Sequence, residues 1–107
     1  MTNLSAGELK AWLDDASRAH PVLLDVREPW EWEIGHIETS QHMPMRTIPT
    51  RLHEINRDAE IVVICHHGGR SAQVGHFLEH QGFARIYNLA GGVHGWSERV
   101  DPTLPIY

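Results

Sequence analysis

The only cysteine of this 107-residue chain, Cys65, stands directly after a short apolar run and before a polar, glycine-rich segment. The run is Ile61 to Ile64, four consecutive β-branched residues, which is typical of a buried strand in a parallel sheet. From Ser71 the apolar residues follow helical spacing. We therefore expect Cys65 at a strand end, in a tight loop that leads into a helix N-terminus. Amide groups and the helix dipole stabilise a reactive thiolate there, whereas a buried structural cysteine is the alternative interpretation.

The segment behind Cys65 is expected to cradle an anion or a sulfur substrate. Its glycines tolerate positive φ and let the backbone close around sulfur, although paired glycines also occur in plain turns. The arginine either binds an oxyanion from the pocket or folds back to brace the loop. The histidines either add positive charge or are solvent-exposed. The predicted cradle residues are His66, His67, Gly68, Gly69, Arg70 and Ser71.

Two further charged residues lie at the end of another predicted strand, Val22 to Val26. Asp25 lies at the carboxyl end of this strand, and Arg27 follows two residues later. This pattern suits a buried ion pair or hydrogen bonds that brace a loop. Both residues are therefore candidates for supporting the site.

The elements expected to position these residues alternate between strand and helix. Ser5 and Glu8 form a capping box before a helical stripe of Leu9, Trp12, Leu13 and Ala16. Further strands are expected over 22–26, 40–43, 61–64 and 84–89, and further helices over 29–33, from Pro49 through Leu52 and Ile55, over 71–81 and around Trp96. The pattern predicts an α/β fold, a parallel sheet of about five strands flanked by helices on both faces. Ligands bind at the carboxyl ends of such strands, where Cys65, Asp25 and the Gly91-Gly92 turn are expected.

Composition limits the function classes. A net charge of −5 makes nucleic acid and anionic membranes poor partners, and no apolar run approaches the roughly 20 residues of a membrane span. A single cysteine excludes an internal disulfide framework and is typical of a reducing compartment, so we expect one cytoplasmic domain over 1–107. The nine histidines show no ligand spacing apart from His76 and His80, so neither a metal nor a cofactor is expected.

Three segments together resemble the rhodanese sulfurtransferase family. Residues 24–37, Leu-Asp-Val-Arg-Glu-Pro-Trp-Glu-Trp-Glu-Ile-Gly-His-Ile, are similar to its upstream Asp-Val-Arg-Glu and Gly-His-Ile motif. Residues 65–71 resemble its Cys-x-x-Gly-x-Arg active-site loop, and residues 89–96, Leu-Ala-Gly-Gly-Val-His-Gly-Trp, resemble its closing Gly-Gly-x-x-x-Trp motif. The chain departs from the family at Glu38 to Pro44, where small residues and Asn-Ile-Pro are usual.

The resemblance implies a single-domain, rhodanese-like fold and sulfur transfer through a Cys65 persulfide. The implied donor is a small sulfur-containing anion such as thiosulfate, or a persulfide. The implied acceptor is cyanide, a thiol or a sulfur-carrier protein. Asp25 and Arg27 would support the loop without reacting, and Arg70 would lie at the pocket.

Two other functions remain as alternatives. A cysteine-dependent phosphatase or arsenate reductase of the same fold would need a wider loop, with the arginine six positions after the cysteine. Here Arg70 lies five positions after Cys65. A non-catalytic rhodanese-like binding module would commonly have lost the cysteine, whereas this chain retains it within a complete loop.

Overall fold

The computed structural model describes residues 1–107 and contains one five-stranded, all-parallel sheet. The strands are β1 (Thr2–Leu4), β2 (Val22–Asp25), β3 (Gln41–His42), β4 (Ile61–Ile64) and β5 (Ile86–Leu89), in the spatial order β1-β5-β4-β2-β3. β4 lies at the centre, between β2 and β5. The predicted parallel α/β sheet is confirmed.

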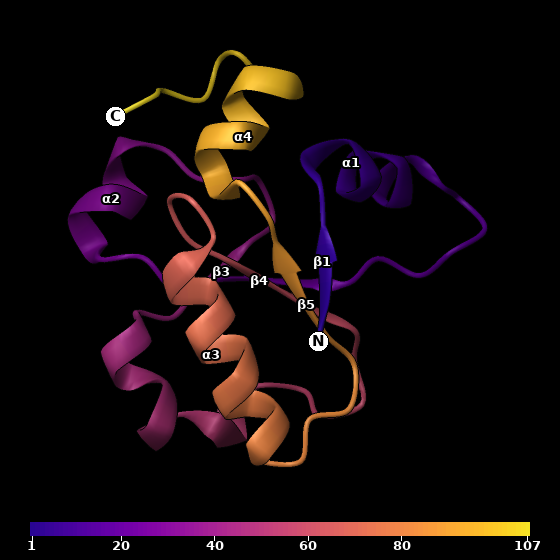
Figure 1. Ribbon diagram of the computed structural model, residues 1–107, viewed down its shortest axis with the longest axis vertical. Helices are drawn as coiled ribbons and strands as arrows, with labels where there is room; N and C mark the ends of the chain where they lie inside the picture. Colours follow the sequence, from indigo (N-terminus) through magenta and orange to yellow (C-terminus); the bar gives the residue numbers. More distant parts are fainter.

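Helices cover both faces of this sheet, as expected (Figure 1). The α-helices are α1 (Ala6–Asp14), α2 (Pro29–Ile34), α3 (Gly69–His80) and α4 (Gly92–Arg99), and two 3₁₀ turns are η1 (Met45–Thr50) and η2 (Leu52–Glu54). None of the helices has both the length and the apolar character that crossing a bilayer requires.

The side chains of β4 alternate between two apolar cores. Ile61 and Val63 pack in the core beneath α3 and the 3₁₀ turns, whereas Val62 and Ile64 pack in the core beneath α1 and α4. All four are fully buried. Because a strand alternates its side chains between faces, an uninterrupted apolar run is what a central strand covered on both sides requires.

Several predicted elements differ from the observed ones. Ala16 lies beyond the end of α1 and is exposed, so the predicted stripe is one residue too long. The helix expected from Pro49 is wrong: Pro49 lies inside η1, and Leu52 begins the separate turn η2. Proline has no N–H to donate within a helix and disfavours the helical conformation of the residue before it, which explains the short turns.

The edge strand β1 was not expected from the sequence. It has only three residues, and two of them, Thr2 and Asn3, are exposed. A partly solvated edge strand of this length carries neither an apolar run nor a clear alternation. Its pairing with β5 closes one side of the sheet.

Candidate active site

Cys65 directly follows β4 at the carboxyl edge of the sheet. Its side chain is 1% exposed and packs at the margin of the core beneath α3. The sulfur nevertheless contacts polar groups of the loop, because the amide of Gly68 donates to Cys65 Sγ at 3.0 Å. The hydroxyl of Ser71 lies 3.3 Å from the same sulfur. The thiol is therefore turned toward the loop and the start of α3.

Of the backbone amides expected to stabilise the sulfur, only one contacts it directly. Gly68 is the one residue whose amide donates to Cys65 Sγ. The amides of Gly69, Arg70 and Ser71 form the first turn of α3 and have no acceptor within the chain, as is usual at a helix start. These free donors could bind an anion that extends from the sulfur.

Backbone conformation at Gly68 brings the loop back toward the cysteine. Gly68 precedes α3 with φ of +110°, a region that residues with a side chain rarely adopt. A Cβ at this position would also lie 3.4 Å from the backbone of Leu89 and Gly91. The first glycine of the pair is thus required by the fold, whereas Gly69 begins the helix and has open space around it.

Ser71 connects the cysteine to a buried amide on the neighbouring strand. Its hydroxyl donates to Asn88 Oδ1, and Asn88 Nδ2 donates to the carbonyl of Gly68 at 3.2 Å and to Asn3 Oδ1 at 3.0 Å. Ser71 is completely buried and Asn88 nearly so. Sequence reasoning missed Asn88, although a polar amide inside an otherwise apolar strand is a usable signal.

Asp25 and Arg27 form a buried ion pair at the end of β2. Arg27 Nη2 lies 2.7 Å from Asp25 Oδ2, and both side chains are essentially inaccessible to solvent. Arg27 also donates to the carbonyls of Glu31 and Gly35, at 3.3 and 2.8 Å. This pair therefore ties β2 to the middle and the C-terminal end of α2, and neither residue contacts the sulfur.

Arg70 pairs with Glu31, a residue that sequence reasoning missed. Its Nη1 and Nη2 lie 2.6 and 2.9 Å from the two carboxylate oxygens, and Glu31 is 3% exposed. The hydrogen bonds from Arg70 lower the pKa of Glu31 to about 2. The geometry corresponds to the bracing alternative for Arg70, and oxyanion binding by this residue stays a prediction. A local pattern could have identified Glu31. Its carboxylate also accepts from the amide of Glu28, three residues earlier, as in a capping box at a helix start.

The C-terminal segment reaches the site as well, and Figure 1 shows it running toward α2. The hydroxyl of Tyr107 donates to Glu31 Oε2 at 2.8 Å and accepts from Arg27 Nη1 at 3.0 Å. Its ring stacks on His66, with centroids 3.9 Å apart and planes 8° from parallel. Burial raises the pKa of Tyr107 to about 12, so the hydroxyl keeps its proton at neutral pH. No local pattern pointed to this residue.

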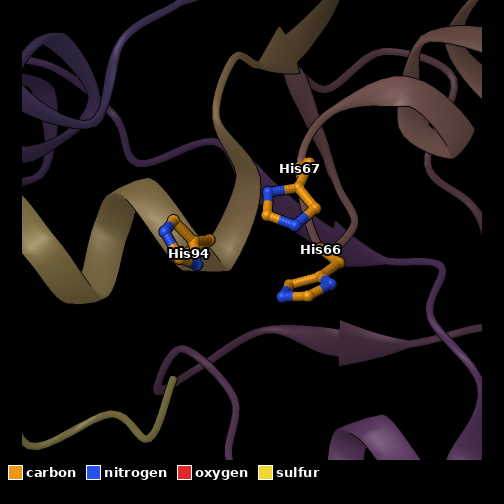
Figure 2. A group of neighbouring side chains, drawn as sticks. All are labelled: His66, His67 and His94. Carbon is orange, nitrogen blue, oxygen red and sulfur yellow. The ribbon is translucent and has the colours of Figure 1, made fainter. Parts of the chain in front are cut away.

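The two loop histidines lie beside a third histidine from α4. The rings of His66 and His67 have centroids 3.9 Å apart, and those of His67 and His94 are 5.0 Å apart (Figure 2). His67 is exposed, whereas His66 and His94 are half-buried. Burial lowers the pKa of His66, and the neighbouring His67 lowers it further. The sequence showed no ligand spacing for His94, yet the fold brings it beside His66 and His67.

The start of α4 is held tightly against the loop. The amide of Val93 donates to the carbonyl of Cys65 at 3.0 Å, and the amide of His94 donates to the carbonyl of His66 at 3.1 Å. Gly92 has φ of +58°, and a Cβ there would lie 2.4 Å from the Cys65 oxygen and 2.3 Å from the His66 oxygen. The Gly91-Gly92 turn therefore permits a backbone approach that any side chain would block.

Comparison with known proteins gives a consistent picture. The model of the family described as "Rhodanese-like domain" matches residues 5–99. The chain is 40% identical over 83 residues to a sulfurtransferase of Allochromatium vinosum, covering 78% of both chains. It is 36% identical over 75 residues to the thiosulfate sulfurtransferase GlpE of Pseudomonas fluorescens, covering 70% of this chain and 69% of that protein.

A solved structure and a longer relative extend the comparison. The crystal structure of a rhodanese-like domain protein from Staphylococcus aureus superposes with a TM-score of 0.86 and 33% identity, covering 100% of this chain and 99% of that one. The chain spans only 30% of a rhodanese-like/PpiC domain-containing chloroplast protein of Arabidopsis thaliana, to which it is 39% identical. The same kind of domain thus occurs in short chains and within longer proteins.

Proposed function

This chain belongs to the rhodanese-like domain family, and we propose that it transfers a sulfane sulfur through a persulfide on Cys65. The family relatives described above include a sulfurtransferase and a thiosulfate sulfurtransferase. The observation that carries the proposal is the position of the cysteine sulfur. Cys65 Sγ accepts from the Gly68 amide beside the unpaired amides of the first turn of α3.

The reaction proceeds in two half-reactions. In the first, the thiol of Cys65 loses its proton to solvent, and the thiolate attacks the outer sulfur of thiosulfate or of a persulfide. A new S–S bond forms on Cys65, the old S–S bond breaks, and sulfite or a thiolate leaves with the electron pair. In the second, cyanide or a thiolate attacks the outer sulfur of the Cys65 persulfide, and the Cys65 thiolate leaves. Covalent catalysis of this kind gives ping-pong kinetics.

The loop supplies the electrostatic stabilisation that both states need. The Gly68 amide already donates to the sulfur, and the free amides of Gly69 and Arg70 lie in the adjoining helix turn. Amides held in place by the fold stabilise negative charge without reorganising during the reaction. The Ser71 hydroxyl lies near the sulfur but donates its proton to Asn88 Oδ1, so the amides supply this stabilisation.

The charged residues around the loop hold its backbone in place and take no direct part in the reaction. Arg70 holds Glu31, and Arg27 holds both Asp25 and the backbone of α2. These contacts join the loop after β4 to the end of β2. We propose that Asp25, Arg27 and Glu31 keep the cradle in shape and that none of them exchanges a proton with substrate.

The phosphatase and binding-module alternatives are less well supported. Arg70 lies five positions after Cys65, so the loop is one residue shorter than a phosphatase of this fold requires. In addition, the guanidinium of Arg70 is paired with Glu31. A binding module would not need the contact between Gly68 and the cysteine sulfur.

Steady-state kinetics with thiosulfate and cyanide would test the proposal. Varying each substrate at several fixed concentrations of the other should give parallel double-reciprocal lines, and Cys65→Ser should abolish turnover. Release of phosphate from an aryl phosphate by the wild type, without any sulfur transfer, would favour the phosphatase alternative. Wild-type biological activity in Cys65→Ser would favour the binding module.

A further inference from the structure

We propose that His66, His67 and His94 form a binding site for a divalent transition-metal ion of the Zn²⁺ class. Each imidazole offers one ring nitrogen, and these three nitrogens all lie within 4.8 Å of one another. Figure 2 shows the three rings around a common space, two from the loop after β4 and one from α4. Imidazole nitrogen is a preferred ligand of Zn²⁺, Ni²⁺ and Cu²⁺.

Two of the ring nitrogens lack any partner in the folded chain. His66 Nε2 and His94 Nδ1 are buried, and neither makes a hydrogen bond. Buried polar atoms without a partner are uncommon, because the lost hydration costs free energy. A metal ion that accepts the lone pairs of both nitrogens would compensate for that loss.

The surroundings of His94 favour the ligand form of its ring. Its Nε2 lies 2.9 Å from Glu98 Oε1, one helical turn further along α4. When Nε2 donates its proton to this carboxylate, Nδ1 presents its lone pair. A carboxylate hydrogen-bonded to the far nitrogen of a coordinating imidazole is the usual way in which proteins orient metal-binding histidines.

The backbone holds two of the three ligands in register before any ion arrives. The amide of His94 donates to the carbonyl of His66 at 3.1 Å, and Gly92 permits the close approach. The remaining ligand, His67, is exposed, and its ring lies beside those of His66 and His94. A tetrahedral ion with Zn–N bonds of about 2.0–2.1 Å places its ligands roughly 3.4 Å apart, so shifts of about 1 Å would close the site.

Three histidines leave the fourth coordination position to solvent or to a small ligand. Because Cys65 is not one of the three ligands, the metal site and the proposed sulfur chemistry can be tested separately. His76 and His80, which lie one helical turn apart on the exposed face of α3, provide a control pair of histidines outside the proposed site.

Isothermal titration of the full chain with Zn²⁺, together with Co²⁺ absorption spectra, would test the site. We expect one equivalent to bind, with at least a tenfold loss of affinity in both His94→Gln and His67→Gln. The double variant His76→Ala/His80→Ala should retain the affinity. The exposed position of His67 makes its variant informative even if His94→Gln fails to fold.

The Cys65→Ser variant separates this inference from the proposed function. It should bind Zn²⁺ with the affinity of the wild type, although it transfers no sulfur. Its Co²⁺ spectrum should match that of the wild type, because Cys65 is not a ligand and contributes no thiolate charge-transfer band. Wild-type affinity in His67→Gln and His94→Gln, or no measurable binding of Zn²⁺ by the wild type, would overturn the assignment. Binding that disappears only in Cys65→Ser or in the His76/His80 variant would overturn it as well.

Discussion

The carboxylate of Glu31 holds both terminal nitrogens of Arg70, with N···O distances of 2.6 and 2.9 Å. Glu31 belongs to α2, and Arg70 belongs to the first turn of α3, directly behind the proposed nucleophile. The same carboxylate accepts from the hydroxyl of Tyr107 and from the amide of Glu28. One buried side chain thus connects the active-site loop, α2 and the C-terminal segment.

This pair predicts an acid-dependent loss of stability. The pKa of Glu31 is lowered from 4.5 to about 2 in the folded chain, so the unfolded chain binds more protons between these values. The contribution of Glu31 is therefore fully present above about pH 4.5 and is lost as the pH falls toward 2. We expect Glu31 to contribute about 2 kcal/mol to the free energy of unfolding at neutral pH. This is less than the pKa difference alone would give, because Arg70 is 36% exposed and solvent screens the pair.

Urea unfolding between pH 2 and 7 would measure this contribution. Glu31→Gln should lower stability at pH 7 and flatten the acid limb of the profile. Glu33→Gln, an exposed neighbour on the same helix, serves as the control. If stability depended on pH in the same way in the wild type and in Glu31→Gln, titration of Glu31 would contribute nothing to stability.

The buried pair at the end of β2 predicts a larger effect. In Asp25→Asn, the guanidinium of Arg27 would stay buried without a compensating charge. Leaving one partner of a buried ion pair alone costs about 3–5 kcal/mol of folding free energy. Chemical denaturation would measure the loss, and Asp14→Asn, which breaks the exposed pair with Lys10, should cause no measurable change. A small loss in Asp25→Asn would mean that the pair is not required for folding.

The glycines at the start of α4 offer a matched comparison. Gly92→Ala would place a Cβ against the carbonyls of Cys65 and His66 and would strain a residue with φ of +58°. We expect a loss of about 3 kcal/mol or more, together with loss of sulfur transfer. Gly95→Ala, in the same helix but with open space around it, should be neutral or stabilise by up to about 1 kcal/mol. Equal thermal stability of the two variants would contradict the close approach.

The hydroxyl near the sulfur predicts an effect on reactivity. Ser71→Ala removes the hydroxyl 3.3 Å from Cys65 Sγ, which donates its own proton to Asn88 Oδ1 and can therefore only accept from the neutral thiol. Losing this acceptor favours the thiolate, and a neutral hydrogen bond contributes about 0.5–1.5 kcal/mol, so alkylation of Cys65 by iodoacetamide should speed up about two- to tenfold. As a control, Cys65 should be alkylated at the wild-type rate in Ser17→Ala, because Ser17 lies on an exposed turn. An unchanged rate in Ser71→Ala would exclude this role.

Local sequence patterns were sufficient to predict the central strand and the first helix. The β-branched run of β4 and the capping box of α1 are encoded by neighbouring residues, and both are present as expected. β1 and the 3₁₀ turns were not predicted correctly, because a short edge strand and proline-containing turns lack a clear period.

The contacts that hold the site together were harder to predict. Glu31 lies 39 positions before Arg70, and Tyr107 lies 80 positions after Arg27. His94 comes from a different element than His66 and His67, and only the sheet topology brings them together. Such contacts depend on tertiary packing, and a single sequence carries no periodic signal for them.

Mass spectrometry of the chain after exposure to thiosulfate, or to a persulfide donor, tests the sulfur-transfer mechanism most directly. The mechanism predicts a gain of exactly one sulfur atom on the peptide containing Cys65, its removal by cyanide or a thiol, and no gain in Cys65→Ser. An unmodified Cys65 with every sulfane donor, or sulfur attached at another residue, would contradict it.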